Sequence, residues 1–320
     1  MRKWLAAALC LSLWLGFAGT AAHSAQAAPS KSDMKVYLNG FDISEWKWEE
    51  NHIMVPLFAF DDYSYFDEQD KKDKQDITYN WDAKSKTVWV YPADKTRTVK
   101  LVANEAHALV NGKQVNLDAP VRLIDGHTYV PLRFISEALG GKVVWNEAKK
   151  TAVIRTPERV KRDEVIRTGS LEDARKEALR LPTVHPNREL LPRAEGFAVS
   201  IQFPEGEALR YYYSVKDIMS YVVINGDGLA EVMWQGRRGT ASDKFIEEIG
   251  NKPEQEEKAV YFNHSFPVQD VVTYGKVGVD GTTAQLGKFE VTKSLRSHAD
   301  AIIAIPGEKR TDGEQPDGKA

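Results

Sequence analysis

The stretch DGHTYVPLRFISEALG, residues 125–140, decides the fold of the first half of the chain. Its opening Asp125-Gly126 pair predicts a two-residue hairpin turn, because both residue types tolerate positive φ. Pro131 favours the first turn of a helix, where its missing N–H costs nothing. The apolar residues from Phe134 to Leu139 then recur at helical spacing, and Gly140 ends the helix. The stretch therefore predicts a β-hairpin that leads into a short amphipathic helix.

Strand signals lie on both sides of this stretch. Upstream, Asn111-Gly112 is a second strong turn signal after a short apolar run. Downstream, Val143 and Trp145, followed by the β-branched residues of 151–154, predict a closing hairpin. Residues 106–156 thus predict one unit made of strand, turn, strand, short helix and hairpin.

The same order of signals occurs once more, earlier in the chain, when residues 34–92 are laid over residues 106–156. The first copy has Val-Pro-Leu at residues 55–57, which match residues 130–132 of the second copy. It also carries a longer charged insertion, residues 67–76, which is expected to form an exposed loop. One copy is too small to bury its own apolar face, so we expect the two copies to share one core.

This motif resembles the copper amine oxidase N-terminal-like family, the "stalk" domain of exported Gram-positive proteins, over about residues 34–156. The resemblance implies a small antiparallel sheet curled around a short helix. It implies neither copper nor amine oxidation, since the family corresponds to an accessory region outside the catalytic core. The first copy departs from the motif at Phe58, where Arg is expected, so a structural ion pair of Arg133 would have no counterpart there. The motif positions expected to be structural are Asn111, Gly112, Val130, Pro131, Leu132, Arg133, Phe134, Gly140 and Trp145.

The remaining chain predicts a helical linker and a second, β-rich domain. Residues 157–192 are highly charged, and Ser170 begins a capping-box-like start of a helix to about Arg180. The basic residues of 159–167 alternate with acids, which indicates a solvated helix or linker. Residues 193–306 predict an antiparallel β-meander, interrupted by one helix over 243–249. The tail, residues 307–320, is almost free of apolar residues and is expected to be disordered. The predicted class is α+β.

The first 27 residues have the pattern of a secretory signal peptide. Arg2 and Lys3 precede an apolar run, and small residues follow with an Ala25-x-Ala27 step. The alternative is a signal anchor, but the apolar run is shorter than a membrane-spanning helix needs. Cleavage near Ala27 would also remove Cys10, the one cysteine of the chain. We therefore expect a secreted, extracytoplasmic protein without a further transmembrane segment, and its lack of cysteine is typical of a Gram-positive cell envelope.

Composition excludes several classes of function. The chain has 43 basic and 46 acidic residues among 320, so it lacks the basic excess that nucleic-acid binding requires. One cysteine can form neither a disulfide framework nor a cysteine-based zinc site. An amine oxidase would need a His-x-His copper pair and a Tyr within Asn-Tyr-Asp/Glu, and the sequence has neither. These observations predict no nucleic-acid partner and no amine oxidase activity.

The sequence assigns no catalytic residue, no metal ligand and no cofactor. His264 next to Ser265 suggests a general base, but a polar residue at a strand end is the stronger interpretation, because no nucleophile elbow accompanies it. His185 and His298 would be needed to complete a metal site, and only their number supports one. Paired acids of a glycoside hydrolase would be invisible in a sequence, and solvated hairpin charges explain the acidic residues more simply.

Aromatic residues are the candidates for ligand contact. Trp46 and Trp48 are two residues apart and would share one strand face, as would Tyr211 and Tyr213 with Tyr212 opposite. Such residues stack on sugar rings or build sheet cores, and both interpretations stay open for Trp46 and Trp48. Core positions are favoured for four further tryptophans, namely Trp81, Trp89, Trp145 and Trp234.

The function that fits these features is a non-catalytic, exported binding or scaffolding protein of the cell envelope. Its expected partner is a cell-wall polymer, a glycan or an extracytoplasmic protein. The alternative is a hydrolase of cell-wall material or glycan with its site in residues 193–306, and a third option is a regulator of another protein. A hydrolase predicts convergent carboxylates or histidines in a cleft, whereas a binding protein predicts an aromatic or polar face without them.

Overall fold

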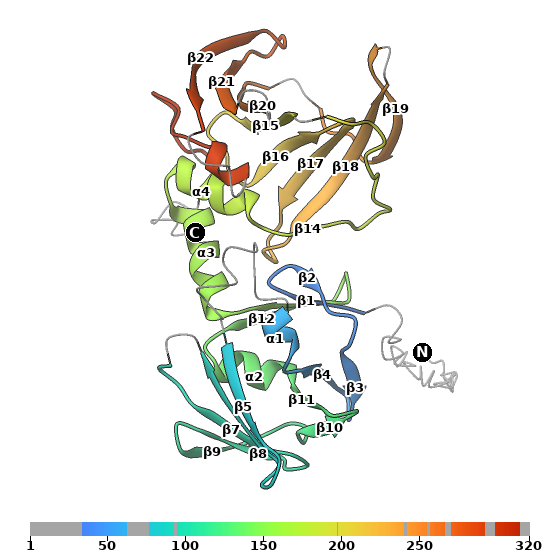
Figure 1. The fold of residues 1–320 in the computed structure, drawn as a ribbon, viewed down its shortest axis with the longest axis vertical. Helices are drawn as coiled ribbons and strands as arrows, with labels where there is room; N and C mark the ends of the chain where they lie inside the picture. The colour runs from blue at the N-terminus through green and yellow to red at the C-terminus, as the bar shows by residue number, and fades with distance from the viewer. Residues whose placement is uncertain are drawn as a thin grey trace, which may run out of the picture.

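The structure, a computed structural model, describes residues 34–62, 77–92, 95–196, 198–239, 242–254, 257–265, 270–291 and 298–313. Two lobes are stacked along the long axis, and helix α3 (Pro157–Thr168) runs beside them from the first lobe to the second (Figure 1). The predicted signal peptide, the charged insertion 67–76 and residues 314–320 lie outside the described residues. Among the described helices, none has both the length and the apolar character that crossing a membrane requires.

Three short sheets form the N-terminal lobe. The first has the order β12 (Lys142–Asn146), β13 (Thr151–Arg155), β1 (Lys35–Leu38) and β2 (Phe41–Asp42), with β1 parallel to β13. The second has the order β10 (Arg122–Ile124), β11 (His127–Pro131), β4 (His52–Pro56) and β3 (Lys47–Glu49). The third is antiparallel and contains β5 (Ile77–Asp82), β6 (Thr87–Pro92), β7 (Val99–Val102), β8 (His107–Val110) and β9 (Lys113–Asn116).

The two copies of the repeat share one core, as predicted. Their Val-Pro strands pair with each other in the second sheet, where Val55 of β4 lies opposite Val130 of β11. Helices α1 (Ala59–Asp62) and α2 (Leu132–Ala138) follow these strands at equivalent places. The common core contains Val36, Leu38 and Val55 from the first copy and Val130, Ile135 and Ile154 from the second. Where one curled sheet was expected, the same core is enclosed by three.

The turn chemistry of the motif is confirmed in the backbone. Asn111 and Gly112 have φ of +50° and +78°, and Asp125 and Gly126 have φ of +51° and +81°, as a type I′ hairpin turn requires. Pro131 stands at the N-cap of α2. At the other end of α2, Gly140 has φ of +87° and its N–H donates to the carbonyl oxygen of Glu137, which ends the helix. Local chemistry therefore positions both hairpins and the helix.

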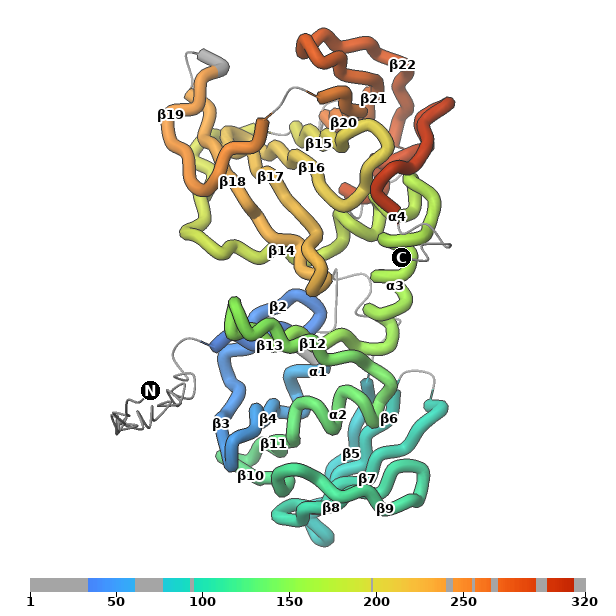
Figure 2. Tube along the Cα trace, turned by 180° about the vertical axis from the view of Figure 1, so that it is seen from behind, coloured from blue at the N-terminus to red at the C-terminus, as the bar shows by residue number. Residues whose placement is uncertain are grey.

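One large sheet forms the C-terminal lobe and confirms the predicted antiparallel meander. In Figure 2 its strands curve into a half-barrel with α4 (Leu171–Leu179) along one side. The strand order is β14-β18-β17-β16-β15-β20-β21-β22, and β19 also pairs with β18. The strands are β14 (Thr183–Val184), β15 (Ala198–Pro204), β16 (Arg210–Val215), β17 (Ile218–Ile224), β18 (Ala230–Gly239), β19 (Ser242–Gly250), β20 (Ala259–Ser265), β21 (Val271–Val277) and β22 (Thr283–Glu290).

The predicted helix over 243–249 is wrong, because this segment is strand β19. It pairs antiparallel with β18, with Gln235 opposite Ile249. Burial alternates along it, so that Phe245 and Ile249 are partly covered while Ile246 is exposed. Phe245 packs edge-on against Trp234, with ring centroids 4.9 Å apart. Pairing with a long neighbouring strand has overridden the local helical signal.

Residues 157–192 join the two lobes as a packed element. The helix predicted after Ser170 is confirmed as α4, and its N-cap side chain accepts from the N–H of Asp173. Ile166, Ala178 and Leu181 from this segment belong to the core of the C-terminal lobe. Arg159 on α3 is buried, with 1% of its surface exposed, so the expectation of a solvated helix or linker is wrong there.

Arg159 occupies the joint between the lobes. Its guanidinium donates to the carbonyl oxygen of Asn39 in the first lobe and to that of Gly228 in the second. The Nε atom donates to Oδ1 of Asp163 at 2.7 Å. An apolar cluster adjoins this joint and consists of Tyr37, Val153, Val184 and Leu229. The lobes therefore share a buried polar centre as well as apolar contacts.

The first part of the tail is packed, against the expectation of disorder over 307–320. Glu308 forms an ion pair with Arg175 of α4 at 2.6 Å, and both side chains are 1% exposed. Asp312 accepts from the N–H groups of Ala208 and Leu209. Residues 307–313 therefore close one end of the C-terminal lobe.

Candidate functional site

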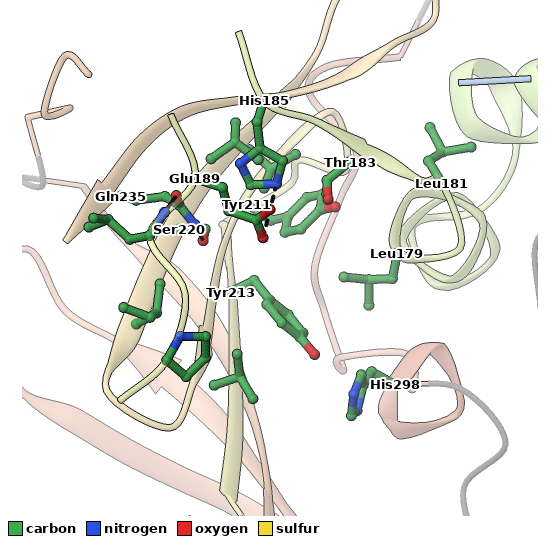
Figure 3. A pocket seen from close by; sticks show the side chains of 16 residues that line it. Leu179, Leu181, Thr183, His185, Glu189, Tyr211, Tyr213, Ser220, Gln235 and His298 are labelled. Carbon is green, nitrogen blue, oxygen red and sulfur yellow. Dashed lines mark hydrogen bonds and ion pairs between the residues drawn. The ribbon is translucent and has the colours of Figure 1, made fainter. Parts of the chain in front are cut away.

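A cavity of about 350 Å³ lies between the C-terminal sheet and the segment 179–192 that crosses it (Figure 3). Strands β16 and β17 supply its floor, with Tyr213 and Ser220 among the side chains that line it. The end of α4, strand β14 and the following loop supply the covering side. His298, on the 3₁₀ helix His298–Ala301, completes the rim next to Tyr213. The cavity thus brings together parts of the chain that are far apart in sequence.

Alternation along β16 positions the tyrosines. Tyr211 and Tyr213 line the cavity, while Tyr212 lies on the opposite face in a cluster with Met219 and Trp234. This arrangement agrees with the predicted face. Tyr211 is 2% exposed and packs against Phe203, so it forms floor and core at once. Tyr213 is partly exposed, which makes it the aromatic ring that a ligand can reach. Ligand contact itself stays a prediction for both residues.

Polar groups of the cavity are tied to its walls. Gln235 donates to the hydroxyl of Ser220 at 3.0 Å, and its Oε1 accepts from the N–H of Leu190 at 2.8 Å. This second bond fastens the covering segment to the sheet. His185 lies 3.7 Å from the carboxylate of Glu189 on the same segment. Among the described residues that line the cavity, Glu189 is the single carboxylate.

Tyr213 and His298, at one side of the cavity, are neutral at physiological pH. Burial raises the pKa of Tyr213 to about 12, so its hydroxyl keeps its proton. Burial, and secondarily the neighbouring His264, lowers the pKa of His298 below its usual 6.5. The rings of Tyr213 and His298 lie 5.6 Å apart. This side of the cavity therefore presents hydrogen-bonding groups without net charge.

Because the pKa of His298 is lower in the folded state, protonation of this residue opposes folding. Below pH 6.5 the unfolded chain binds this proton first, so His298 contributes a loss of stability as the pH falls from 6.5 towards its folded pKa. A His298→Gln variant is expected to lose less stability than the unmodified protein between pH 7 and pH 5. Denaturant unfolding at both pH values measures the difference, and equal losses would contradict the assignment.

Two histidines of the C-terminal lobe each pair with a carboxylate. His264 Nε2 lies 2.6 Å from Asp270 Oδ1, a pairing that the sequence did not indicate because no motif spacing joins two residues six positions apart. His185 pairs with Glu189 instead. Within the described ranges, no group of three or more His, Cys, Asp or Glu side chains gathers as metal ligands would.

The tryptophans of the N-terminal lobe separate into core and surface. Trp46 is buried in the common core, whereas Trp48 is 39% exposed on β3, so the two do not share a face. Trp81 is 41% exposed, and Trp89 is exposed as well, so the core prediction is wrong for both. Trp234 is buried and Trp145 is half-buried, which agrees with the prediction for the first and partly for the second.

The motif residues of the N-terminal lobe likewise include both core and surface positions. Val130 and Leu132 are buried in the core, and Phe134 packs against it. Arg133 is exposed, and within the described chain its side chain makes no ion pair. Arg133 lines a cavity together with Trp145.

Comparison with known proteins supports one assignment. No curated protein and no solved structure matches the chain. Among protein-family models, that of the copper amine oxidase N-terminal domain matches residues 49–154. The match begins at the end of β3 and ends in β13, so it spans both copies of the Val-Pro-Leu strand and α2. Over residues 49–154 the chain therefore resembles the copper amine oxidase N-terminal domain, as its motif predicts.

Proposed function

We propose that this protein is an exported, non-catalytic binding protein of the cell envelope. In this proposal the N-terminal domain is a stalk-type module, and the C-terminal lobe binds a neutral segment of wall glycan in the cavity beside Tyr213. The family match supports the module, and the leader-like sequence of residues 1–27 supports export. The cavity supports binding by the C-terminal lobe.

One observation carries the choice of ligand. A reachable tyrosine ring stands in a cavity of about 350 Å³ among neutral hydrogen-bonding groups, namely Ser220, Gln235 and His298. A sugar ring presents an apolar face for stacking and hydroxyl groups at its edge, so it is complementary to both features. A strongly charged ligand would lose its hydration without gaining a counter-charge from these groups.

The joint between the lobes supports a presenting role for the N-terminal module. Asn146 donates to Asp227 at 2.7 Å, and Lys149 lies 2.7 Å from Glu231. These two contacts bind the β12–β13 hairpin to the C-terminal sheet. The buried Arg159 adds hydrogen bonds to both lobes. A module held in this way carries the cavity at a fixed distance from whatever anchors the first lobe.

The hydrolase alternative has weaker support. Hydrolysis of a glycosidic bond requires two carboxyl groups on opposite sides of the bond in most families. Among the described residues of the cavity no second carboxylate accompanies Glu189, and the Ser220 hydroxyl accepts a hydrogen bond from the amide of Gln235. The two histidines on the rim are the observation that keeps this alternative testable.

The experiment is co-sedimentation of the protein with purified peptidoglycan, followed by titration with N-acetylglucosamine oligosaccharides. The unmodified protein is expected to sediment with the wall material and to bind the oligosaccharide. Tyr213→Ala is expected to weaken binding about tenfold or more, as loss of a stacking ring commonly does.

A matched control is Tyr221→Ala, since Tyr221 lies on the adjacent strand and packs against Tyr212 on the other face of the sheet. It should bind like the unmodified protein. Absence of binding to wall material, together with a stable protein partner in co-purification, would contradict the proposal. Release of soluble sugar from the peptidoglycan would instead favour the hydrolase.

A further inference from the structure

The N-terminal domain contains two cavities that are equivalent under its internal repeat. One is lined by Leu57, Phe58 and Trp81 of the first copy and by His127 of the second. The other is lined by Leu132, Arg133 and Trp145 of the second copy and by His52 of the first. Each residue of one set aligns with a residue of the other, and each cavity lies where a β-strand from one copy meets the helix start of the other. The two cavities can therefore be compared residue by residue within one domain.

The first of these cavities, which we call the Phe58 cavity, is partly filled by its own side chains. The Phe58 ring packs edge-on against His127, with ring centroids 4.8 Å apart. The remaining volume is about 180 Å³. The Phe58 ring therefore occupies part of the space beside His127.

The second, which we call the Arg133 cavity, is larger, at about 320 Å³. Arg133 stands where the first copy has Phe58. The Nδ1 atom of His52 bonds to the carbonyl oxygen of Glu50 at 2.7 Å, so a neutral His52 keeps Nε2 as an acceptor. Two indole rings line this cavity, Trp145 and the exposed Trp48.

The charge of Arg133 has no counter-charge among the described residues. Its side chain is exposed and has no acidic partner in the part of the chain that the structure describes. Trp145 is held in place, since its Nε1 donates to Glu147 at 2.6 Å. A fixed indole beside an uncommitted guanidinium is complementary to a flat, partly apolar ring that carries an acid, because guanidinium binds carboxylate in a bidentate way. The volume is at the small end of ligand cavities and fits one ring.

We propose that the Arg133 cavity binds a pyranose ring that carries a carboxylate. The ring lies against the indoles of Trp48 and Trp145, and its carboxylate pairs with Arg133. This chemistry is shared by sugars with a lactyl ether and by uronic acids, and both occur in wall polymers. The proposal is independent of the cavity beside Tyr213, which takes a neutral segment.

The test is NMR titration of the protein, observed at the indole N–H signals of its tryptophans. The probes are N-acetylmuramic acid and glucuronic acid, each with its neutral counterpart, N-acetylglucosamine and glucose. We expect the acids to shift the signals of Trp48 and Trp145 and to leave Trp81, in the equivalent Phe58 cavity, unchanged. Which of the two acids binds more tightly identifies the source of the carboxylate.

Variants locate the effect. Arg133→Gln is expected to weaken binding of the acid about tenfold or more, and Arg133→Phe is expected to abolish it by reproducing the filled state of the Phe58 cavity. Trp81→Ala is the matched control for Trp48→Ala, because both rings are exposed to a similar degree. Tyr213→Ala should bind the acid as the unmodified protein does, which separates this site from the proposed function.

Several outcomes would overturn the inference. Equal binding of the acidic and neutral sugars, or unchanged binding by Arg133→Gln, would remove the role of the guanidinium. Equal shifts on addition of inorganic phosphate would show an anion site without recognition of the ring. Unchanged Trp48 and Trp145 signals with both acids would exclude the site.

Discussion

Asp163→Ala is expected to lower the free energy of unfolding by about 3 to 5 kcal/mol, the usual cost of leaving one partner of a buried ion pair alone. Asp163 is the carboxylate that neutralises Arg159, which is almost fully buried at the joint between the lobes. Burial lowers the pKa of Arg159, and the attraction of Asp163 opposes that shift. Without Asp163, the buried guanidinium loses this carboxylate and keeps neutral acceptors such as the carbonyl oxygens of Asn39 and Gly228.

Denaturant unfolding, followed by circular dichroism and tryptophan fluorescence, measures this loss. Because Arg159 bonds to both lobes, the two probes are expected to separate in Asp163→Ala, as the lobes begin to unfold independently. The control is Lys149→Ala, which removes an ion pair with Glu231 from the same joint at a more exposed place and should cost no more than about 1 kcal/mol. Similar small losses for both variants would show that Arg159 is not the centre of the joint.

Removal of residues 306–320 is expected to destabilise the C-terminal lobe by a comparable amount, whereas removal of residues 314–320 is expected to have little effect. The longer deletion takes away Glu308, the buried partner of Arg175. It also removes Asp312, which accepts from two backbone N–H groups, and Arg310, which donates to the carbonyl oxygens of Ile166 and Gly169. Buried groups that lose their partners carry the full cost of their desolvation.

The shift of the thermal unfolding midpoint distinguishes the two deletions. Glu308→Gln serves as a milder variant, since it keeps the shape of the side chain and removes the charge that faces Arg175. We expect it to fall between the two deletions. If both deletions unfold at the temperature of the full chain, the contacts of 307–313 do not contribute to stability.

Elements that depend on local chemistry could be predicted from the sequence. The turns at Asn111-Gly112 and Asp125-Gly126 need positive φ, and few residue pairs supply it. Helix α2 lies between a proline and a glycine, and its apolar side faces a core that the repeat itself implied. The shared core of the two copies followed from the small size of each copy.

Elements that depend on distant partners could not be predicted. The segment 243–249 has helix-like local signals, yet β18 offers it a strand partner that the sequence does not reveal. The polar tail looks disordered until Arg175 provides a buried counter-charge for Glu308. Arg159 looked like part of a solvated face, because its two carbonyl acceptors lie in segments about 70 and 120 residues away.

In the candidate sites, too, features set by local sequence could be predicted and features set by distant partners could not. The shared face of Tyr211 and Tyr213 followed from strand alternation, and the structure agrees. The covering segment 179–192 and the approach of His298 did not, because no spacing rule connects them with β16. Arg133 could be predicted as a motif residue, but its cavity is lined by residues of both copies, which no spacing within one copy indicates.

The most direct measurement of sugar binding beside Tyr213 is a crystal structure of the protein soaked with an N-acetylglucosamine oligosaccharide. A sugar ring is expected against Tyr213, with hydrogen bonds to groups among Ser220, Gln235 and His298, and with the backbone of the covering segment nearly unchanged. A saturating soak that leaves this cavity without sugar, while the oligosaccharide binds elsewhere on the chain, would contradict binding by the C-terminal lobe.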